Sequence, residues 1–137
     1  MTQPKPTVLP GAVPVMPLTK RALVRTLTKR HPQMRAINAL LAEREAEGIE
    51  TYEIVLMAPN GRDFLKDAIE EAADLVQYVS GDRHLASVSP PATPAEAETR
   101  LDRLRLLHAL VATAYNEVTN ELRTAEADAA AANGSPF

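Results

Sequence analysis

The residues best suited to chemistry lie between Gly61 and Ser80, where acidic side chains recur on one side of a predicted helix. At about 100° per residue, one arc of that helix collects Asp63, Asp67, Glu70, Glu71 and Asp74, with Tyr78 continuing the line. Like charges four residues apart cost roughly 0.2–0.5 kcal/mol per pair in an exposed helix, and Lys66 is the local counter-charge. A bound divalent cation would offset this repulsion, whereas the competing interpretation is a charged outer face.

The residue types and motifs that the sequence lacks leave a metal site with oxygen ligands as the predicted chemistry. The chain has no Cys, which excludes thiolate nucleophiles and zinc–cysteine sites, and it has no G-x-S-x-G elbow, Walker-type glycine loop or EF-hand loop. No His follows a Glu by three positions, which disfavours a ferritin-like di-iron bundle. The predicted ligands are carboxylates on two consecutive helices: Glu43, Glu47, Asp67, Glu71 and Asp74. Such a set suits Mg²⁺ or Mn²⁺, metals that hold phosphates in proteins.

The two helices that carry these ligands each have an apolar face. On the central helix, residues 61–80, the face opposite the carboxylates holds Phe64, Leu65, Ala68, Ile69, Ala72, Leu75, Val76 and Val79. The preceding helix, residues 32–47, is expected to bury Met34, Ile37, Leu40 and Leu41, and Gly48 is expected to end it. Both apolar faces are predicted to pack into a core.

Two more helices complete an all-α bundle of three main helices and one short one. The short helix runs from Lys20 to about Lys29, and the last one from Pro94 to about Arg123, started by a Thr93–Glu96 capping box. Apolar residues recur along the last helix at Leu101, Leu104, Leu107 or His108, Val111, Tyr115, Val118 and Leu122. At about 1.5 Å per residue this helix is roughly 40 Å long, so part of it is expected to pack against another subunit.

The remaining segments are predicted to connect or flank this helical domain, residues 20–123. Residues 1–19 contain five prolines and are predicted to form an extended arm, either a loose tail or a segment lying on a neighbouring subunit. Residues 51–57 have strand-like composition and are predicted as an extended connection, or at most a small hairpin edge. Residues 82–94 are predicted as a loop, and the Ala-rich end, residues 124–137, as a tail.

Composition limits the class of protein and its partners. A chain of 137 residues fits one domain, and it shows neither a membrane-spanning run nor a signal peptide, so a cytoplasmic protein is expected. The net charge of −3 argues against a dedicated nucleic-acid binder, although the basic side chains of the first helix leave open a DNA-binding patch: Lys20, Arg21, Arg25, Lys29 and Arg30.

The segment Glu71-Ala-Ala-Asp74, followed by Leu75-Val76-Gln77-Tyr78-Val79, resembles the E-x-x-D helix of the MazG-like, all-α nucleoside triphosphate pyrophosphohydrolases. A wider pattern within residues 35–80 is similar to short phage members of that family: Ala42-Glu43-Arg44, Gly48, Tyr52, Gly61-Arg62-Asp63, Asp67-Ala68, Glu71, Asp74-Leu75 and Tyr78. The family's E-x-x-E on the preceding helix is matched imperfectly, because Glu43 and Glu47 are four apart and Glu47-x-x-Glu50 crosses Gly48.

The resemblance implies hydrolysis of a (d)NTP, expected to be a purine such as the dGTP that MazZ-type phage members use, to (d)NMP and pyrophosphate. It also implies two or three Mg²⁺ or Mn²⁺ ions and assembly as a dimer or tetramer. Glu70 or Glu71 would then accept the proton of the attacking water. Residues expected to touch the substrate are Arg62, Lys66 and Arg83 at the phosphates and Tyr78 or Asn116 at the nucleoside. The alternative is a non-enzymatic helical interaction module of phage origin that oligomerises through the last helix.

Overall fold

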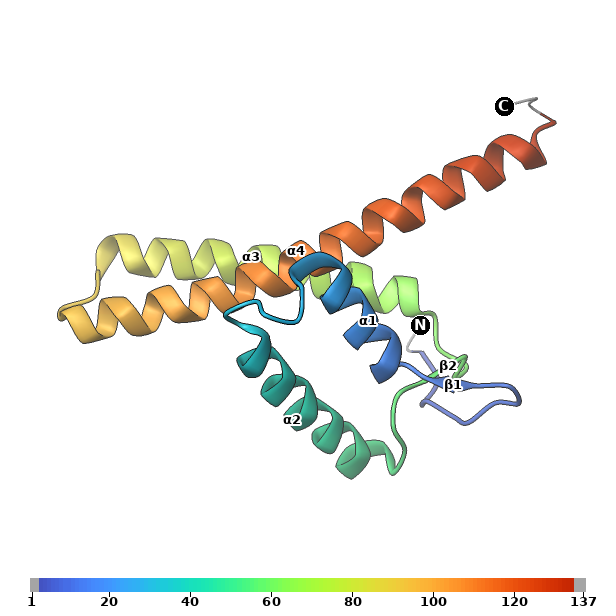
Figure 1. The fold of residues 1–137 in the computed structure, drawn as a ribbon, viewed down its shortest axis with the longest axis horizontal. Helices are drawn as coiled ribbons and strands as arrows, with labels where there is room; N and C mark the ends of the chain where they lie inside the picture. The colour runs from blue at the N-terminus through green and yellow to red at the C-terminus, as the bar shows by residue number, and fades with distance from the viewer. Residues whose placement is uncertain (1–2, 135–137) are drawn as a thin grey trace. The chain divides into compact units, whose positions relative to one another are not determined.

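The computed structural model describes residues 3–134, whose regular elements are helices and one two-stranded sheet (Figure 1). The elements follow in the order β1 (Val13–Pro14), α1 (Met16–Leu27), α2 (Met34–Tyr52), β2 (Met57–Ala58), α3 (Phe64–Val88) and α4 (Pro94–Ala132). The predicted helical class, with three main helices after a shorter first one, is confirmed within these residues. The chain divides into two compact units: unit 1 contains the described residues up to Val15 and Glu45–Asp102, and unit 2 contains Met16–Arg44 and the described residues from Arg103 onward.

Unit 2 is built around a small apolar core. Leu23 of α1, Ile37 of α2 and Ala109 of α4 are buried, and Ile37 has 0% of its surface exposed. Partly buried side chains pack around these three: Leu27, Met34, Leu41, Leu106 and Leu110. The predicted buried stripe of the second helix is therefore confirmed at Met34, Ile37 and Leu41. Because helices in proteins owe most of their stability to such packing, this cluster is what holds the three helical segments of unit 2 together.

Two polar contacts join α1 to α4 within unit 2. The Arg25 guanidinium donates to both carboxylate oxygens of Glu117, at 2.8 and 2.9 Å, and the Asn116 side-chain amide donates to the Thr26 hydroxyl at 3.1 Å. One member of the basic cluster considered as a DNA-binding patch is thus engaged in an ion pair within the unit.

Helix α2 does not end at Gly48, so that part of the sequence prediction is wrong. A glycine inside a helix costs roughly 0.5–1 kcal/mol relative to alanine, which weakens a helix without stopping it. The helix ends after Tyr52 instead, where Glu53 takes a positive φ of 62° and its N–H bonds to the Ile49 carbonyl at 2.7 Å. As a result, the sequence between Glu47 and Glu50 lies on a continuous helix.

The Pro-rich arm lies along its own chain in unit 1. β1 pairs antiparallel with β2, with Val13 opposite Ala58, and the Thr7 N–H donates to the Asn60 carbonyl at 3.0 Å. The extended connection predicted for residues 51–57 is wrong at residues 51 and 52, which belong to α2, whereas Leu56 and Met57 pair with the arm. These contacts differ from the expectation that the arm lies on a neighbouring subunit.

Three helices also extend beyond their predicted ends. α1 starts at Met16 rather than Lys20, because the Pro17 ring is tolerated in the first turn of a helix, where its missing N–H would be unpaired anyway. α3 continues through Gly81 to Val88, so much of the predicted loop 82–94 is helical. α4 reaches Ala132, because alanine has the highest helix propensity of all residues, and the predicted C-terminal tail is helical up to that residue.

The start of α4 follows the predicted capping box closely. The Thr93 hydroxyl accepts the Glu96 N–H at 3.1 Å, and the Glu96 carboxylate accepts the Ala92 N–H at 2.7 Å. Two N–H groups at the helix start are thereby paired by side chains, as such a box requires. The glutamate reaches one residue further back than in the usual form of the motif.

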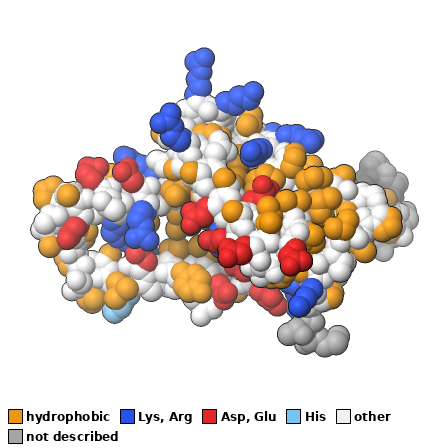
Figure 2. All heavy atoms as spheres, turned by 90° about the horizontal axis from the view of Figure 1, so that it is seen from below, with side chains coloured by type: hydrophobic (Ala, Val, Ile, Leu, Met, Phe, Trp, Pro, Cys, Tyr) orange, Lys and Arg blue, Asp and Glu red, His pale blue; other side chains and the backbone are white. Residues whose placement is uncertain are grey.

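The apolar face of α3 is exposed, although the sequence predicted that it packs into a core. No residue of α3 is buried, and Leu65, Ile69 and Val76 are 70%, 62% and 67% exposed. Figure 2 shows many hydrophobic side chains on the face of the molecule that it draws. Among residues 3–134, no helix combines the length and apolar character that crossing a membrane requires.

Candidate functional site

The E-x-x-D pair lies on the regular, solvent-exposed part of α3. Glu71 and Asp74 are one turn apart and both are exposed. Within the described residues neither side chain makes a hydrogen bond or an ion pair, whereas the neighbouring Glu70 is 3.9 Å from the Lys66 ammonium. The two carboxylates therefore retain all their acceptor capacity for a cation or for water.

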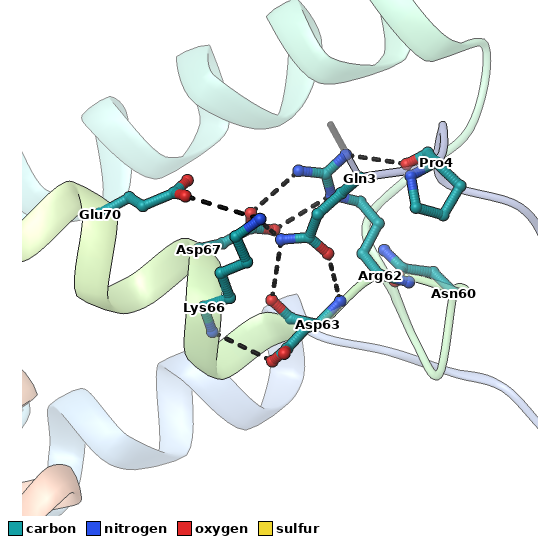
Figure 3. A network of polar contacts seen from close by, with 8 residues as sticks. All are labelled: Gln3, Pro4, Asn60, Arg62, Asp63, Lys66, Asp67 and Glu70. Atoms are coloured by element: carbon teal, nitrogen blue, oxygen red, sulfur yellow. Dashed lines mark hydrogen bonds and ion pairs between the residues drawn. The ribbon is translucent and has the colours of Figure 1, made fainter. Parts of the chain in front are cut away.

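A polar network occupies the first turn of the same helix (Figure 3). The Arg62 guanidinium donates from Nε to Asp67 Oδ2 at 3.0 Å and from Nη2 to Asp67 Oδ1 at 2.9 Å. Its remaining nitrogen, Nη1, donates to the Pro4 carbonyl at 2.9 Å, and the Gln3 side-chain amide donates to Asp67 Oδ1 at 2.5 Å. The bidentate pair is the strongest form of charged hydrogen bond in proteins, and this hydrogen bond to Asp67 raises the pKa of Arg62 above its ordinary value.

The turn before α3 is shaped by the residues that precede this network. Asn60 is fully buried, and its side-chain oxygen accepts the Arg62 N–H at 3.0 Å, which is the Asx turn that asparagine favours. Gly61 has a φ of +81°, a conformation that side chains with a Cβ rarely adopt. Asp63 caps the helix by accepting the Lys66 N–H at 3.0 Å. The G-R-D segment and Asp67 thus have a complete structural role in starting α3 and attaching the arm.

The carboxylates predicted on the second helix are divided between the two units. Glu47 belongs to unit 1, together with Glu71 and Asp74, whereas Glu43 belongs to unit 2. Both are exposed, while Glu45, which the sequence assigned to solvent, is more buried than either. Because α2 is continuous, Glu47-x-x-Glu50 is a spacing of one turn in unit 1 and no longer interrupted at Gly48.

The residues predicted to touch substrate are placed in different surroundings. Tyr78 is 73% exposed on α3, and Arg83 is exposed on the same helix. Lys66 lies beside Glu70, while Arg62 is held by Asp67. Asn116 belongs to unit 2, where it bonds to Thr26.

The predicted ligands are carboxylates, which suit a hard divalent cation, but the described structure does not bring them together around one point. In residues 3–134, no group of three or more acidic or histidine side chains is arranged to hold a metal ion. Glu71 and Asp74 present unpaired carboxylate oxygens, which magnesium and manganese favour. Asp67 fits the predicted ligand set only after release from Arg62 and Gln3, because both of its oxygens are already engaged.

Sequence reasoning missed Gln3, which fastens the arm to α3. Its side-chain amide donates to the Asp63 carbonyl at 3.2 Å and its oxygen accepts the Asp63 N–H at 2.5 Å. These partners are 60 residues apart in the chain, and no local pattern of residue types signals such a contact.

No protein-family profile, no curated protein and no solved structure matches the chain.

Proposed function

We propose that this protein is a metal-dependent nucleoside triphosphate pyrophosphohydrolase that converts a (d)NTP to (d)NMP and pyrophosphate. The observation that carries the proposal is the exposed, unpaired E-x-x-D pair of Glu71 and Asp74 on a continuous helix. Its spacing and the residues around it resemble the catalytic helix of the MazG-like pyrophosphohydrolases. The continuity of α2 supports the same proposal, because it gives unit 1 a second pair of carboxylates, Glu47 and Glu50, with E-x-x-E spacing.

In the proposed site, Glu71, Asp74 and Glu47 hold Mg²⁺ or Mn²⁺, with two or three ions per site. A bound divalent ion neutralises phosphate charge and lowers the pKa of a coordinated water. Glu70 or Glu71 accepts the proton of the water that attacks the α-phosphorus. Glu43, the other predicted ligand on α2, belongs to unit 2 and is left out of the proposed site. Asp67 is assigned to the attachment of the arm rather than to the metal, since Arg62 and Gln3 use both of its oxygens.

The proposed substrate is a purine nucleotide such as dGTP from the cytoplasmic nucleotide pool. Arg83 and Lys66 offset the charge of the triphosphate, and Tyr78 offers an exposed aromatic ring to the base. Arg62 contacts the substrate only if it leaves Asp67. Asn116 belongs to unit 2, where it bonds to Thr26, and is left out of the proposed site. Assembly as a dimer or tetramer, as in the family that the chain resembles, completes the proposal.

A product analysis over all common substrates tests this function. The protein is incubated with the four NTPs and the four dNTPs, with and without Mn²⁺ or Mg²⁺, and the products are separated by chromatography. We expect monophosphate and pyrophosphate in the presence of metal, and loss of at least 100-fold in the Glu71→Gln variant, which removes one carboxylate charge from the site. Glu98→Gln, an exposed glutamate on α4 in the same unit, is the matched control and should retain activity.

Other products or no turnover would each exclude part of the proposal. Release of diphosphate and phosphate would contradict attack at the α-phosphorus while leaving the metal site intact. The absence of turnover with all eight substrates, together with an Asp74→Asn variant that behaves as the parent protein, would favour the helical interaction module.

A further inference from the structure

Helix α4 has two apolar faces within unit 2, and only one of them packs against the unit. Ala109 and Thr113 are buried on the inner face, where Leu106 and Leu110 pack against the core. About 180° around the helix lies a row of six side chains that we call the seam: Leu104, His108, Val111, Tyr115, Val118 and Leu122. Every residue of the seam is exposed, and the five other than His108 range from 37% at Leu104 to 74% at Tyr115.

The spacing of the seam is that of a coiled coil. Successive members are separated alternately by four and three residues, a mean of about 3.5, which keeps apolar side chains facing a neighbouring helix over many turns. The same positions continue C-terminally as Ala125, Ala129 and Ala132, all of which are exposed. Contiguous apolar surface of this kind is rare on monomers and marks interaction sites.

The C-terminal part of α4 also has no buried side chain among the described residues. From Asn120 to Ala129 every residue is exposed, and yet the segment is helical throughout. Isolated helices of this length are marginal in water, because most helical stability in proteins comes from packing. A second helix lying along the seam would supply that packing over the full length of the segment.

The seam is complementary to itself when two copies run antiparallel. Its spacing of four, three, four, three and four residues is the same read from either end. With Leu104 of one copy level with Leu122 of the other, His108 lies level with Val118 and Val111 with Tyr115. Each large side chain therefore meets another large one, as a two-fold symmetric interface requires.

The charges beside the seam favour the same direction. In a parallel pair in register, Glu121 and Glu126 of the two copies occupy the flanking positions that contact one another across a coiled coil, and like charges there repel. In the antiparallel pair, Glu121 of one copy lies level with position 105 of the other, so the two Glu121 side chains are about 24 Å apart along the helix axis. The repulsion of the parallel pair is therefore absent.

We infer that the seam of α4 is an interface for a second copy of this chain, with the two α4 helices antiparallel. The inference does not depend on the proposed function, since none of the seam residues belongs to the candidate metal site. It specifies which face, which partner and which direction, none of which follows from helix length alone.

Light scattering after size-exclusion chromatography measures the assembly directly. We expect the parent protein to have a mass of two or more chains of 14.9 kDa, and the Val118→Glu and Leu122→Glu variants to fall to half of that mass or less. Asn120→Glu, an exposed position on the same helix but off the seam, is the matched control and should keep the parent mass. Circular dichroism establishes that the seam variants remain folded.

Chemical cross-linking determines the direction of the pair, because the chain has no natural cysteine. In the antiparallel pair, position 114 lies beside the two-fold axis, so Ala114→Cys should cross-link to itself with a bismaleimide of about 10 Å. The two Cys residues of Ala125→Cys would be about 36 Å apart along the helix axis and should not cross-link.

Three results would overturn the inference: a parent mass of a single chain, seam variants with the parent mass, or cross-linking of Ala125→Cys without cross-linking of Ala114→Cys. The activity of the same samples is measured separately, so that loss of the interface and loss of the proposed function are distinguished.

Discussion

Truncation of Ile37 tests the packing that holds unit 2 together. Ile37 has no exposed surface and clusters with Leu23 and Ala109, two of the few buried apolar residues in the described chain. Replacing a buried isoleucine by alanine removes its transfer free energy and leaves a cavity, a combined cost of about 2–5 kcal/mol. Because the core is small and its rim is only partly buried, the surroundings can relax, and we expect the free energy of unfolding to fall by about 3 kcal/mol.

The structure provides a control of the same type on the same helix. Ile49 is 42% exposed, so Ile49→Ala should lower the free energy of unfolding by less than about 1 kcal/mol. Ile37→Val should cost about 1 kcal/mol, and it provides a measurement if Ile37→Ala does not fold. Native stability is typically 5–15 kcal/mol in total, so the difference between the two alanine variants is well resolved.

Urea unfolding followed by circular dichroism gives these values. The titration is repeated at two protein concentrations, because association adds a concentration-dependent contribution to stability. Equal losses for Ile37→Ala and Ile49→Ala, or a loss below about 1 kcal/mol for Ile37→Ala, would refute the assignment of the core.

Three further predictions concern the attachment of the arm, its pH dependence and two glycines. Arg62→Ala should detach the arm and speed amide hydrogen exchange at Thr7 by about threefold or more. The control variant Arg83→Ala should leave that exchange rate unchanged. Unchanged exchange in Arg62→Ala would mean that the arm is held without the ion pair. The hydrogen bond to Asp67 raises the pKa of Arg62 above its ordinary value, so the guanidinium stays charged and its contribution stays fully present below that ordinary value. Thr7 protection should therefore stay constant from neutral pH to about pH 10, and a loss in that range would contradict the assignment. Gly81→Ala adds a Cβ in open space within a helix and should raise the free energy of unfolding by about 0.5–1 kcal/mol. Gly61→Ala, at φ +81°, should lower it by about 1 kcal/mol. Urea unfolding measures both changes, and the reverse order would refute the conformation assigned to the turn before α3.

The interiors of the helices were predictable from sequence, whereas most of their ends, apart from the start of α4, were not. The spacing of Met34, Ile37 and Leu41 identified a face that the structure buries. Glycine often marks the end of a helix, but Gly48 and Gly81 both lie inside helices. A glycine destabilises a helix by only roughly 0.5–1 kcal/mol relative to alanine, and the helix propensity of the residues that follow can outweigh this cost.

Contacts between distant residues were beyond local patterns. The pairing of β1 with β2 and the bonds of Gln3 to Asp63 and Asp67 join segments that no periodicity relates. The apolar face of α3 illustrates a different limit, because periodicity identifies a face that avoids water but not what covers it. That face was predicted to form a core and is exposed in the described chain.

The candidate site was predictable in part. The E-x-x-D spacing of Glu71 and Asp74 was visible in the sequence, and the structure places both carboxylates, exposed and unpaired, on one helix. The acidic and basic residues one to two turns earlier could not be assigned from sequence, because charged residues form ion pairs as readily as they bind ligands. Asp67 and Arg62 form such a pair.

Hydrolysis in ¹⁸O-labelled water, with mass spectrometry of the products, tests the proposed reaction most directly. With dGTP and Mn²⁺, attack at the α-phosphorus places the label in dGMP and leaves pyrophosphate unlabelled, which is the expected result. Label in pyrophosphate, release of dGDP with labelled phosphate, or no turnover of any (d)NTP would contradict the proposed function.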